Sequence, residues 1–210
     1  IYAKKGNIKQ ARRIISELEN ENPYEKERLL LTEAQILRDV KKQADALDVL
    51  KKGLTEFPKS TNILYDYALT AENLGQYDHM ETALRKIIEI DPQYQQAYNA
   101  LGYSFADRNI RLEEAHALIE QAMKLAPNDP FITDSFGWVL FRQGKIDEAE
   151  QQLRQAYQLR SDPEIAVHLG EVLWVKGDKE GALAFFRQAK AKDAKNELLH
   201  STLSRCLLYT

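Results

Sequence analysis

The stretch DSFGWVLFRQGK, residues 134–145, carries the most information about the fold. It holds six consecutive apolar residues, Phe136 to Phe141, between Asp134 and Arg142. An ordinary surface helix shows a single apolar stripe, whereas six apolar residues in a row point to every side of a helix. We therefore expect this segment to be a helix that other helices contact on more than one side.

Residues of the same kind recur along the whole chain at a fixed period. One column of small residues consists of Ala34, Ala68, Gly102, Gly137, Gly170 and Ser204, at spacings of 34, 34, 35, 33 and 34. A second column consists of Ala11, Ala46, Met80, Ala115, Ala149 and Ala182, and a large apolar residue follows four positions after each. Helix-ending prolines (Pro23, Pro58, Pro92, Pro127) and turn glycines (Gly6, Gly75, Gly144, Gly177) separate the columns. This pattern predicts a repeated helix–turn–helix unit of about 34 residues.

These columns resemble the tetratricopeptide repeat (TPR). The best matches are AYNALGYSFADRNIRLEEAHALIEQAMKLAP and FGWVLFRQGKIDEAEQQLRQAYQL, and the resemblance covers the whole chain. It implies an all-α fold, a right-handed α-solenoid of helix–turn–helix repeats with a helix content of roughly 75% or more, far above the usual third. We expect residues 1–210 to form a single TPR solenoid, with a partial repeat at 1–25, full repeats at 27–60, 61–94, 95–129, 130–162 and 163–196, and a final helix at 197–210.

Composition narrows the class of protein. Apolar residues make up 44% of the chain and charged residues 29%, an ordinary balance for a chain that buries a core. A formal net charge of −3 without a basic stripe argues against a nucleic-acid partner. No apolar run approaches the ~20 residues of a membrane span, so we expect no direct membrane insertion by this segment.

The position of each apolar residue of the opening stretch around the helix axis predicts which neighbour it faces. Phe136, Gly137 and Leu140 are expected to face the second helix of the repeat, and Val139 an adjacent repeat. Trp138 and Phe141 fall at positions that line the concave groove in the TPR family. The same phase along the chain gives the candidate partner-binding residues Tyr65, Leu69, Asn99, Tyr103, Phe131, Asp134, Trp138, Phe141, Arg142, Val167, Glu171 and Trp174.

Two interpretations of these aromatic residues stay open. Exposed aromatic side chains bring a large apolar area at low entropic cost, which a peptide-binding or helix-binding surface needs. Alternatively, the first helices of neighbouring repeats touch, and Trp138 and Phe141 seal the seam between them. The sequence does not separate a groove from a seam.

Chemistry-bearing motifs are missing from the pattern. The histidines (His79, His116, His168, His200) show no short metal-ligand spacing, and Glu164 and Glu171, one helical turn from His168, are expected to form solvated charge pairs with it. No phosphate loop or nucleophile motif occurs, so we predict no catalytic residues, no metal and no cofactor, and a protein that is not an enzyme. The positions at which some TPR domains grip a chaperone's terminal carboxylate hold unsuitable residues: Leu31, Gln35, Asp66, Gln96 and Ala100.

The expected function is therefore a protein-interaction scaffold or adaptor that binds a partner protein or peptide. The segment from Leu101 to Glu150, with DPEIAVHLGEVLWVKGD after it, resembles proteobacterial TPR proteins of the cell envelope. Some of these are outer-membrane lipoproteins that present substrates to a periplasmic C-terminal-processing protease. That resemblance implies a periplasmic, outer-membrane-anchored location, with a cytoplasmic location as the alternative. A structural module that fills its groove or its ends with its own chain or a second copy is the other interpretation of function.

The two ends of the chain differ in their patterns. Ala11, Ile14, Ile15 and Leu18 form an apolar face that expects a preceding helix, so we expect a truncated N-terminal end, missing its upstream targeting signal and prone to self-association. At the other end, the final helix resembles a capping helix that packs through Leu199 and Leu203, and Cys206 is expected to remain accessible.

Overall fold

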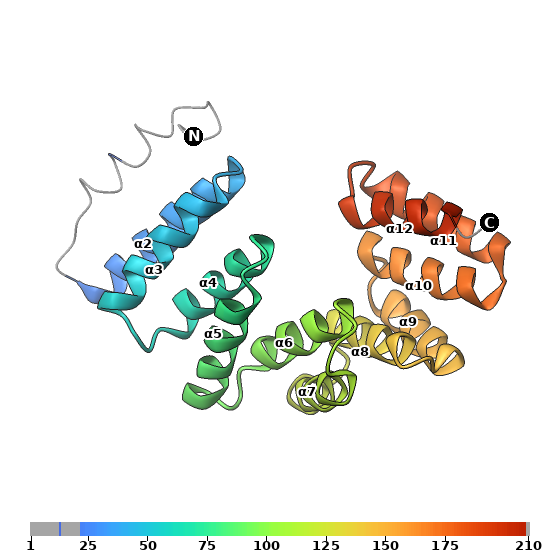
Figure 1. Cartoon of the computed structure of the whole chain (residues 1–210), viewed down its shortest axis with the longest axis horizontal. Coiled ribbons are helices and arrows are strands. Elements are labelled where there is room, and N and C mark those ends of the chain that lie inside the picture. The colour runs from blue at the N-terminus through green and yellow to red at the C-terminus, as the bar shows by residue number, and fades with distance from the viewer. Residues whose placement is uncertain (1–12, 14–21, 209–210) are drawn as a thin grey trace. The chain divides into compact units, whose positions relative to one another are not determined.

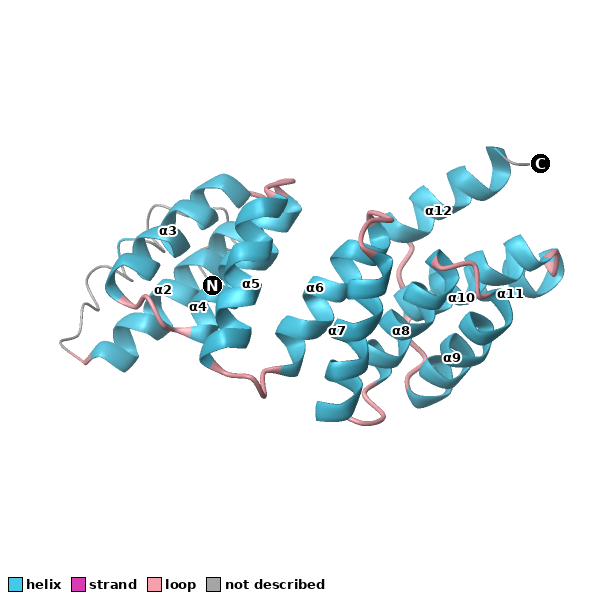
Figure 2. Ribbon diagram, turned by 60° about the horizontal axis from the view of Figure 1, so that its bottom comes forward, coloured by secondary structure: helices cyan, strands magenta, loops and turns pink. Residues whose placement is uncertain are grey.

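The computed structural model describes residue 13 and residues 22–208, with side chains up to residue 206. The described residues form eleven helices and no strand, and Figure 2 shows only short loops between them. The expected all-α fold is confirmed. Most of the partial repeat expected at residues 1–25, including its apolar face at Ile14 and Ile15, lies outside the described residues, so the self-association expected there is not tested.

The chain forms two compact units, residues 1–97 and 98–210. The first unit contains α2 (Pro23–Asp39), α3 (Gln43–Glu56), α4 (Thr61–Asn73) and α5 (Tyr77–Ile90) (Figure 1). The second contains α6 (Gln95–Asp107, which begins just before the boundary), α7 (Leu112–Leu125), α8 (Pro130–Arg142), α9 (Ile146–Leu159), α10 (Pro163–Lys176), α11 (Lys179–Lys192) and α12 (Glu197–Leu208). Successive helices pair as α2 with α3, α4 with α5, α8 with α9 and α10 with α11. We call the even-numbered helices first helices, including α6, which crosses α7 at Gly102, and α12, which packs against the first helix α10.

Local sequence fixes where the first helices begin. Asp129 caps α8 by accepting hydrogen bonds from the backbone N–H groups of Phe131 and Ile132, at 2.9 and 3.0 Å. Asn22, Ser60 and Asp162 cap α2, α4 and α10 in the same way. Proline follows the cap in α2, α8 and α10, where its missing N–H removes no helical hydrogen bond. Capped starts of this kind set the register of each repeat.

The turn inside the third full repeat differs from those of the two repeats that follow. The turns inside the fourth and fifth full repeats use Gly144 and Gly177 at positive φ, whereas this turn places Asn109 and Arg111 there, at φ 55° and 47°. Non-glycine residues tolerate this conformation only with support. Arg111 provides part of it, because its guanidinium carbon lies 3.8 Å from the centre of the buried Phe105 ring. The extra residue of DRNIR is thus absorbed locally and leaves the following helix in register.

The two helices of a repeat cross at the small-residue column. A Cβ atom added to Gly137 would lie 2.6 Å from Cγ of Leu153 on α9, and one added to Gly170 would lie 2.5 Å from Cε1 of Phe186 on α11. Gly102 stands in the same relation to Ile119 of α7. The glycines therefore allow a close crossing, and the large residue of the second column fills the space beside it.

The structure corrects one expectation about a single residue and extends another. The Phe136 ring packs against the buried cluster that includes Ala149 and Leu153 of its partner helix α9, and it also lies 5.1 Å from the ring of His116 on α7. Cys206 was expected to be accessible but is only 4% exposed. The helix α12 lies beside α10 (Figures 1 and 2), and Leu199 and Cys206 belong to the buried apolar cluster of the second unit.

Replacing Gly137 or Gly170 by leucine is expected to lower the free energy of unfolding by more than about 2 kcal/mol, because overpacking forces the two crossing helices apart. Gly137→Leu and Gly170→Leu would be compared with wild type by urea unfolding. Ala184→Leu is the matched control, because it adds the same side chain at a solvent-exposed position of α11. If the two glycine variants unfolded at the same urea concentration as the control, the crossing would not depend on small residues.

Candidate functional site

The twelve candidate residues lie on first helices and divide between the two units. Tyr65 and Leu69 belong to α4 in the first unit. The other ten lie on α6, α8 and α10 of the second unit, and we call them the first-helix face: Asn99, Tyr103, Phe131, Asp134, Trp138, Phe141, Arg142, Val167, Glu171 and Trp174.

Burial separates the members of the first-helix face into two groups. Asp134, Trp138, Val167 and Glu171 are buried. Phe131 is 43% exposed, and the remaining five, Asn99, Tyr103, Phe141, Arg142 and Trp174, are half-buried. Only part of the predicted surface is therefore open to a partner.

The two candidates of the first unit pack against their own neighbours. The Tyr65 ring lies 5.7 Å from that of Tyr94, and burial, with a smaller effect of Tyr94, raises the pKa of Tyr65 to about 12. Leu69 is half-buried on the same helix. Beside them, Arg38 of α2 donates to Asp66 of α4 at 2.8 Å, which joins the first helices of two successive repeats.

Trp138 is at the centre of the first-helix face and is 1% exposed. Its ring stacks on that of His168 of α10, with centroids 4.3 Å apart and an interplanar angle of 24°. Phe141 lies 5.1 Å from Trp138 on α8, and the Arg142 guanidinium is 5.7 Å from the Trp138 ring. Trp138 therefore seals the seam between α8 and α10, and the interpretation that it is an exposed groove residue is wrong.

His168 is not in the solvated environment expected from its sequence neighbours. It is 2% exposed, and its Nδ1 lies 3.0 and 2.9 Å from the two carboxylate oxygens of Asp134 on α8. Its Nε2 lies 3.3 Å from the hydroxyl oxygen of Tyr103 on α6. The sequence analysis missed Asp134 as the partner of His168. The two residues are 34 positions apart, which is one repeat, and this spacing could have indicated that they face each other.

Glu171 has a partner of the same kind on the next first helix. Arg205 of α12 donates to its carboxylate at 2.8 Å, and the buried Thr202 donates at 3.2 Å. Arg205 is also 34 residues away from Glu171. The acidic members of the first-helix face are thus occupied by the chain's own side chains.

The accessible part of the face consists of aromatic side chains near cations. The Arg160 guanidinium carbon lies 5.1 Å from the centre of the Phe131 ring, and Lys179 Nζ lies 3.7 Å from that of Trp174. Phe141 and Arg142, at the end of α8, lie between Phe131 and Trp174 in the sequence. Such pairs present a large apolar area with a positive rim.

Three buried polar atoms on this face have no hydrogen-bond partner among the described residues. They are Oδ1 of Asn99, Nε1 of Trp138 and Nε1 of Trp174. Each unsatisfied buried group costs about 1–3 kcal/mol, and such groups in a native structure call for an explanation.

Other kinds of site find no support in the described residues. In residue 13 and residues 22–208, no group of three or more His, Cys, Asp or Glu side chains could hold a metal ion. Burial and the nearby Glu171 raise the pKa of the Cys206 thiol, which disfavours its reactive thiolate form. None of the helices that the structure describes combines the length and apolarity needed to cross a membrane.

Truncating Trp138 is expected to destabilise the fold, because a fully buried indole leaves a large cavity at the α8–α10 seam. Trp138→Ala should lower the free energy of unfolding by about 3–5 kcal/mol, measured by urea unfolding. Phe131→Ala, which truncates an exposed ring of the same face, is the control and should cost less than about 1 kcal/mol. Equal midpoints for the two variants would show that Trp138 does not seal the seam.

Comparison with known proteins agrees with this geometry. Two models of the tetratricopeptide repeat family match residues 61–94 and 135–197. The TPR repeat-containing protein PA4667 of Pseudomonas aeruginosa is 40% identical over 171 residues, which cover 81% of this chain. The aligned region is 29% of that relative, so the chain spans less than a third of its length.

Solved structures share the fold. A thermophilic TPR protein of Thermus thermophilus superposes with a TM-score of 0.76 at 26% identity, covering 87% of this chain and 99% of that one. YrrB, a TPR protein with an unusual peptide-binding site, has a TM-score of 0.54 at 18% identity, covering 84% and 91% of the two chains. TPR proteins generally mediate protein–protein interactions and are generally not enzymes. By its repeats and its fold, the chain is a tetratricopeptide repeat protein.

Proposed function

We propose that the chain is a non-enzymatic scaffold that binds a partner protein or peptide on the accessible part of the first-helix face. The observation that carries this proposal is the run of incompletely buried aromatic residues on successive first helices: Tyr103 on α6, Phe131 and Phe141 on α8, and Trp174 on α10. Aromatic and arginine side chains dominate the binding energy of protein interfaces.

The position of the cations suggests which kind of segment fits. Arg142 and Lys179 border the aromatic residues, as does Arg160, which also lies 3.7 Å from the carboxylate of Asp162. Asp134 and Glu171 are already paired within the chain. The accessible part is thus apolar with a positive rim. It favours a partner segment that carries apolar anchors next to acidic residues.

We further propose that this scaffold belongs to an envelope adaptor that delivers substrates to a periplasmic C-terminal-processing protease. The support is the resemblance of residues 101–150 to such adaptors, together with the 40% identity to a TPR protein of a proteobacterium. A periplasmic location, with an outer-membrane anchor outside this chain, belongs to the same proposal. Fractionation of cells that express the complete protein tests the location.

A second candidate is a structural module whose first-helix face is filled by its own chain. Asp134, Trp138, Val167 and Glu171 favour it, because all four are buried among side chains of the same unit. The two candidates differ in what they predict for Phe131 and Arg142, which only a binding scaffold needs.

The double variant Phe131→Ala/Arg142→Ala is expected to weaken partner binding at least tenfold, because it removes an exposed anchor and a rim cation while the seam stays intact. Binding of the purified chain to a purified C-terminal-processing protease would be measured by isothermal titration calorimetry. Degradation of a protease substrate would be followed with and without the chain. The binding energy lost corresponds to about 1.4 kcal/mol or more.

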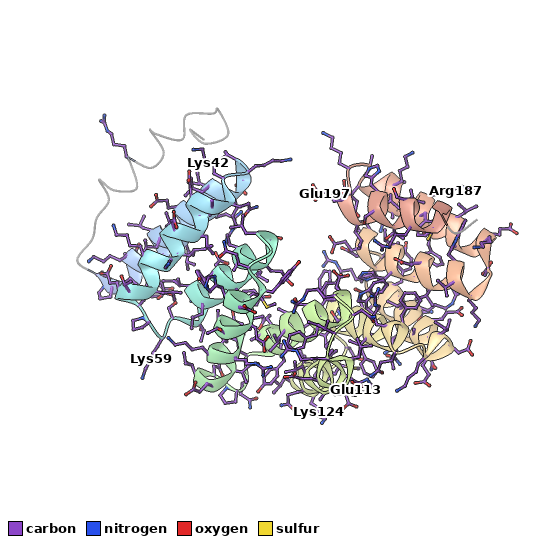
Figure 3. The ribbon with its side chains drawn as sticks, viewed as in Figure 1. Lys42, Lys59, Glu113, Lys124, Arg187 and Glu197 are labelled. Carbon is purple, nitrogen blue, oxygen red and sulfur yellow. The ribbon has the colours of Figure 1, made fainter. Side chains whose placement is uncertain are left out.

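The control is Leu159→Ala/Arg187→Ala, which removes an exposed apolar residue and an exposed cation from the second helices α9 and α11 (Figure 3 labels Arg187). It should bind like wild type. If the protease bound neither wild type nor control, the adaptor proposal would fail. If a partner were bound equally by both double variants, the first-helix face would not be the binding surface.

A further inference from the structure

A chain of hydrogen bonds links three successive first helices of the second unit through buried titratable groups. Tyr103 lies on α6, Asp134 on α8 and His168 on α10. The side chains of His168 and Asp134 are 2% and 9% exposed. A contact between Tyr103 and His168 passes over the intervening repeat, so this chain joins helices that are two repeats apart.

Both ring nitrogens of His168 keep their hydrogen bonds in either protonation state. The imidazolium donates from Nδ1 to Asp134 and from Nε2 to the Tyr103 hydroxyl. The neutral ring with its proton on Nδ1 still donates to Asp134, and its Nε2 then accepts from the Tyr103 hydroxyl. Losing a proton therefore removes an ion pair without leaving a buried polar group unpaired.

The charges around His168 are predominantly negative. Asp134 faces it from α8, and Glu164 and Glu171 influence it from α10 itself. Arg205 of α12 is paired with Glu171, and the Arg142 guanidinium carbon lies 5.7 Å from the centre of the Trp138 ring that stacks on His168. Two charged residues of the neighbouring helices contact α10 away from His168. Glu150 of α9 accepts a hydrogen bond from Lys176, and Lys179 of α11 lies over the Trp174 ring.

These surroundings favour the protonated ring. Burial is the largest single influence and disfavours the imidazolium, but the charge and hydrogen bond of Asp134, with the charges of Glu171 and Glu164, outweigh it. The pKa of His168 is therefore raised above its ordinary value. Tyr103 contributes a neutral hydroxyl that suits both forms of the ring.

We propose that Asp134, His168 and Tyr103 form a pH-responsive clamp that holds α6, α8 and α10 tightly when His168 is protonated and more loosely when it is neutral. Trp138 stacks on the same ring and contacts Phe141. The clamp is therefore connected through Trp138 to Phe141, one of the half-buried aromatic residues. It requires no partner, so it stands or falls independently of the proposed function.

The sign of the pH dependence follows from the raised pKa. The clamp's contribution to stability is fully present below the unfolded-state pKa of histidine, about 6.5. It is lost as the pH rises through the folded-state pKa. Each unit between the two pKa values corresponds to a tenfold change in the unfolding equilibrium constant.

The pKa of His168 can be measured directly on the wild-type chain. The sequence holds four histidines, so the imidazole signals in a carbon–proton NMR spectrum form a small set that His168→Gln and His79→Gln assign. We expect His168 to titrate above about 6.5. In Asp134→Asn its pKa should fall relative to wild type, because burial is then opposed only by the charges of Glu171 and Glu164. A wild-type His168 that titrates at or below the ordinary value would overturn the proposal.

Stability and local opening give the second measurement. From pH 6.5 to 9, the urea midpoint of the wild-type chain should fall relative to that of His168→Gln. His79→Gln alters an exposed histidine and should show the same dependence of the midpoint on pH as wild type.

Hydrogen exchange of the backbone amides in α6 and α8, corrected for intrinsic rates, should become faster over the same pH range in wild type. Tyr103→Phe should keep the raised pKa of His168 but remove the pH dependence of exchange in α6. Parallel slopes for wild type and His168→Gln would show that the buried pair is structural and does not respond to pH.

Discussion

The close crossing of two helices at a small residue is the constraint on which the rest of this structure depends. Gly102, Gly137 and Gly170 leave no room for a side chain against the helix that follows. A first helix held this close to its partner buries one side completely. Its remaining sides then meet only the helices of neighbouring repeats. The first-helix face is a consequence of that geometry, because its residues point where successive first helices approach one another.

That face combines two requirements that oppose each other. Its buried members, Trp138 above all, hold successive repeats together, whereas Phe131 and its half-buried neighbours keep apolar area in contact with solvent. A surface used for binding must leave part of its apolar area uncovered, and the cost falls on stability.

Charged pairs between first helices recur at several places in the array. Arg38 pairs with Asp66 in the first unit, and in the second unit Asp134 pairs with His168 and Glu171 with Arg205. Each joins the first helices of successive repeats. Breaking one member of a buried pair leaves an uncompensated charge, so these pairs favour one relative placement of the two helices over neighbouring registers. In this view the pairs specify alignment, and the apolar columns supply most of the stability.

The sequence by itself determined the helical class, the period and the close crossings, because these depend on local spacing. Small residues recur every repeat, and capping residues and prolines mark the helix starts. It also selected the face on which Trp138, Val167 and Glu171 lie, since phase along a helix is a local property. Only the tertiary structure decided which members of that face are buried. The pairing of His168 with Asp134, in place of the nearer Glu164, depends on how far apart α8 and α10 lie. Burial and pairing between repeats are set by the distance and rotation of neighbouring helices, which no spacing within a single helix encodes.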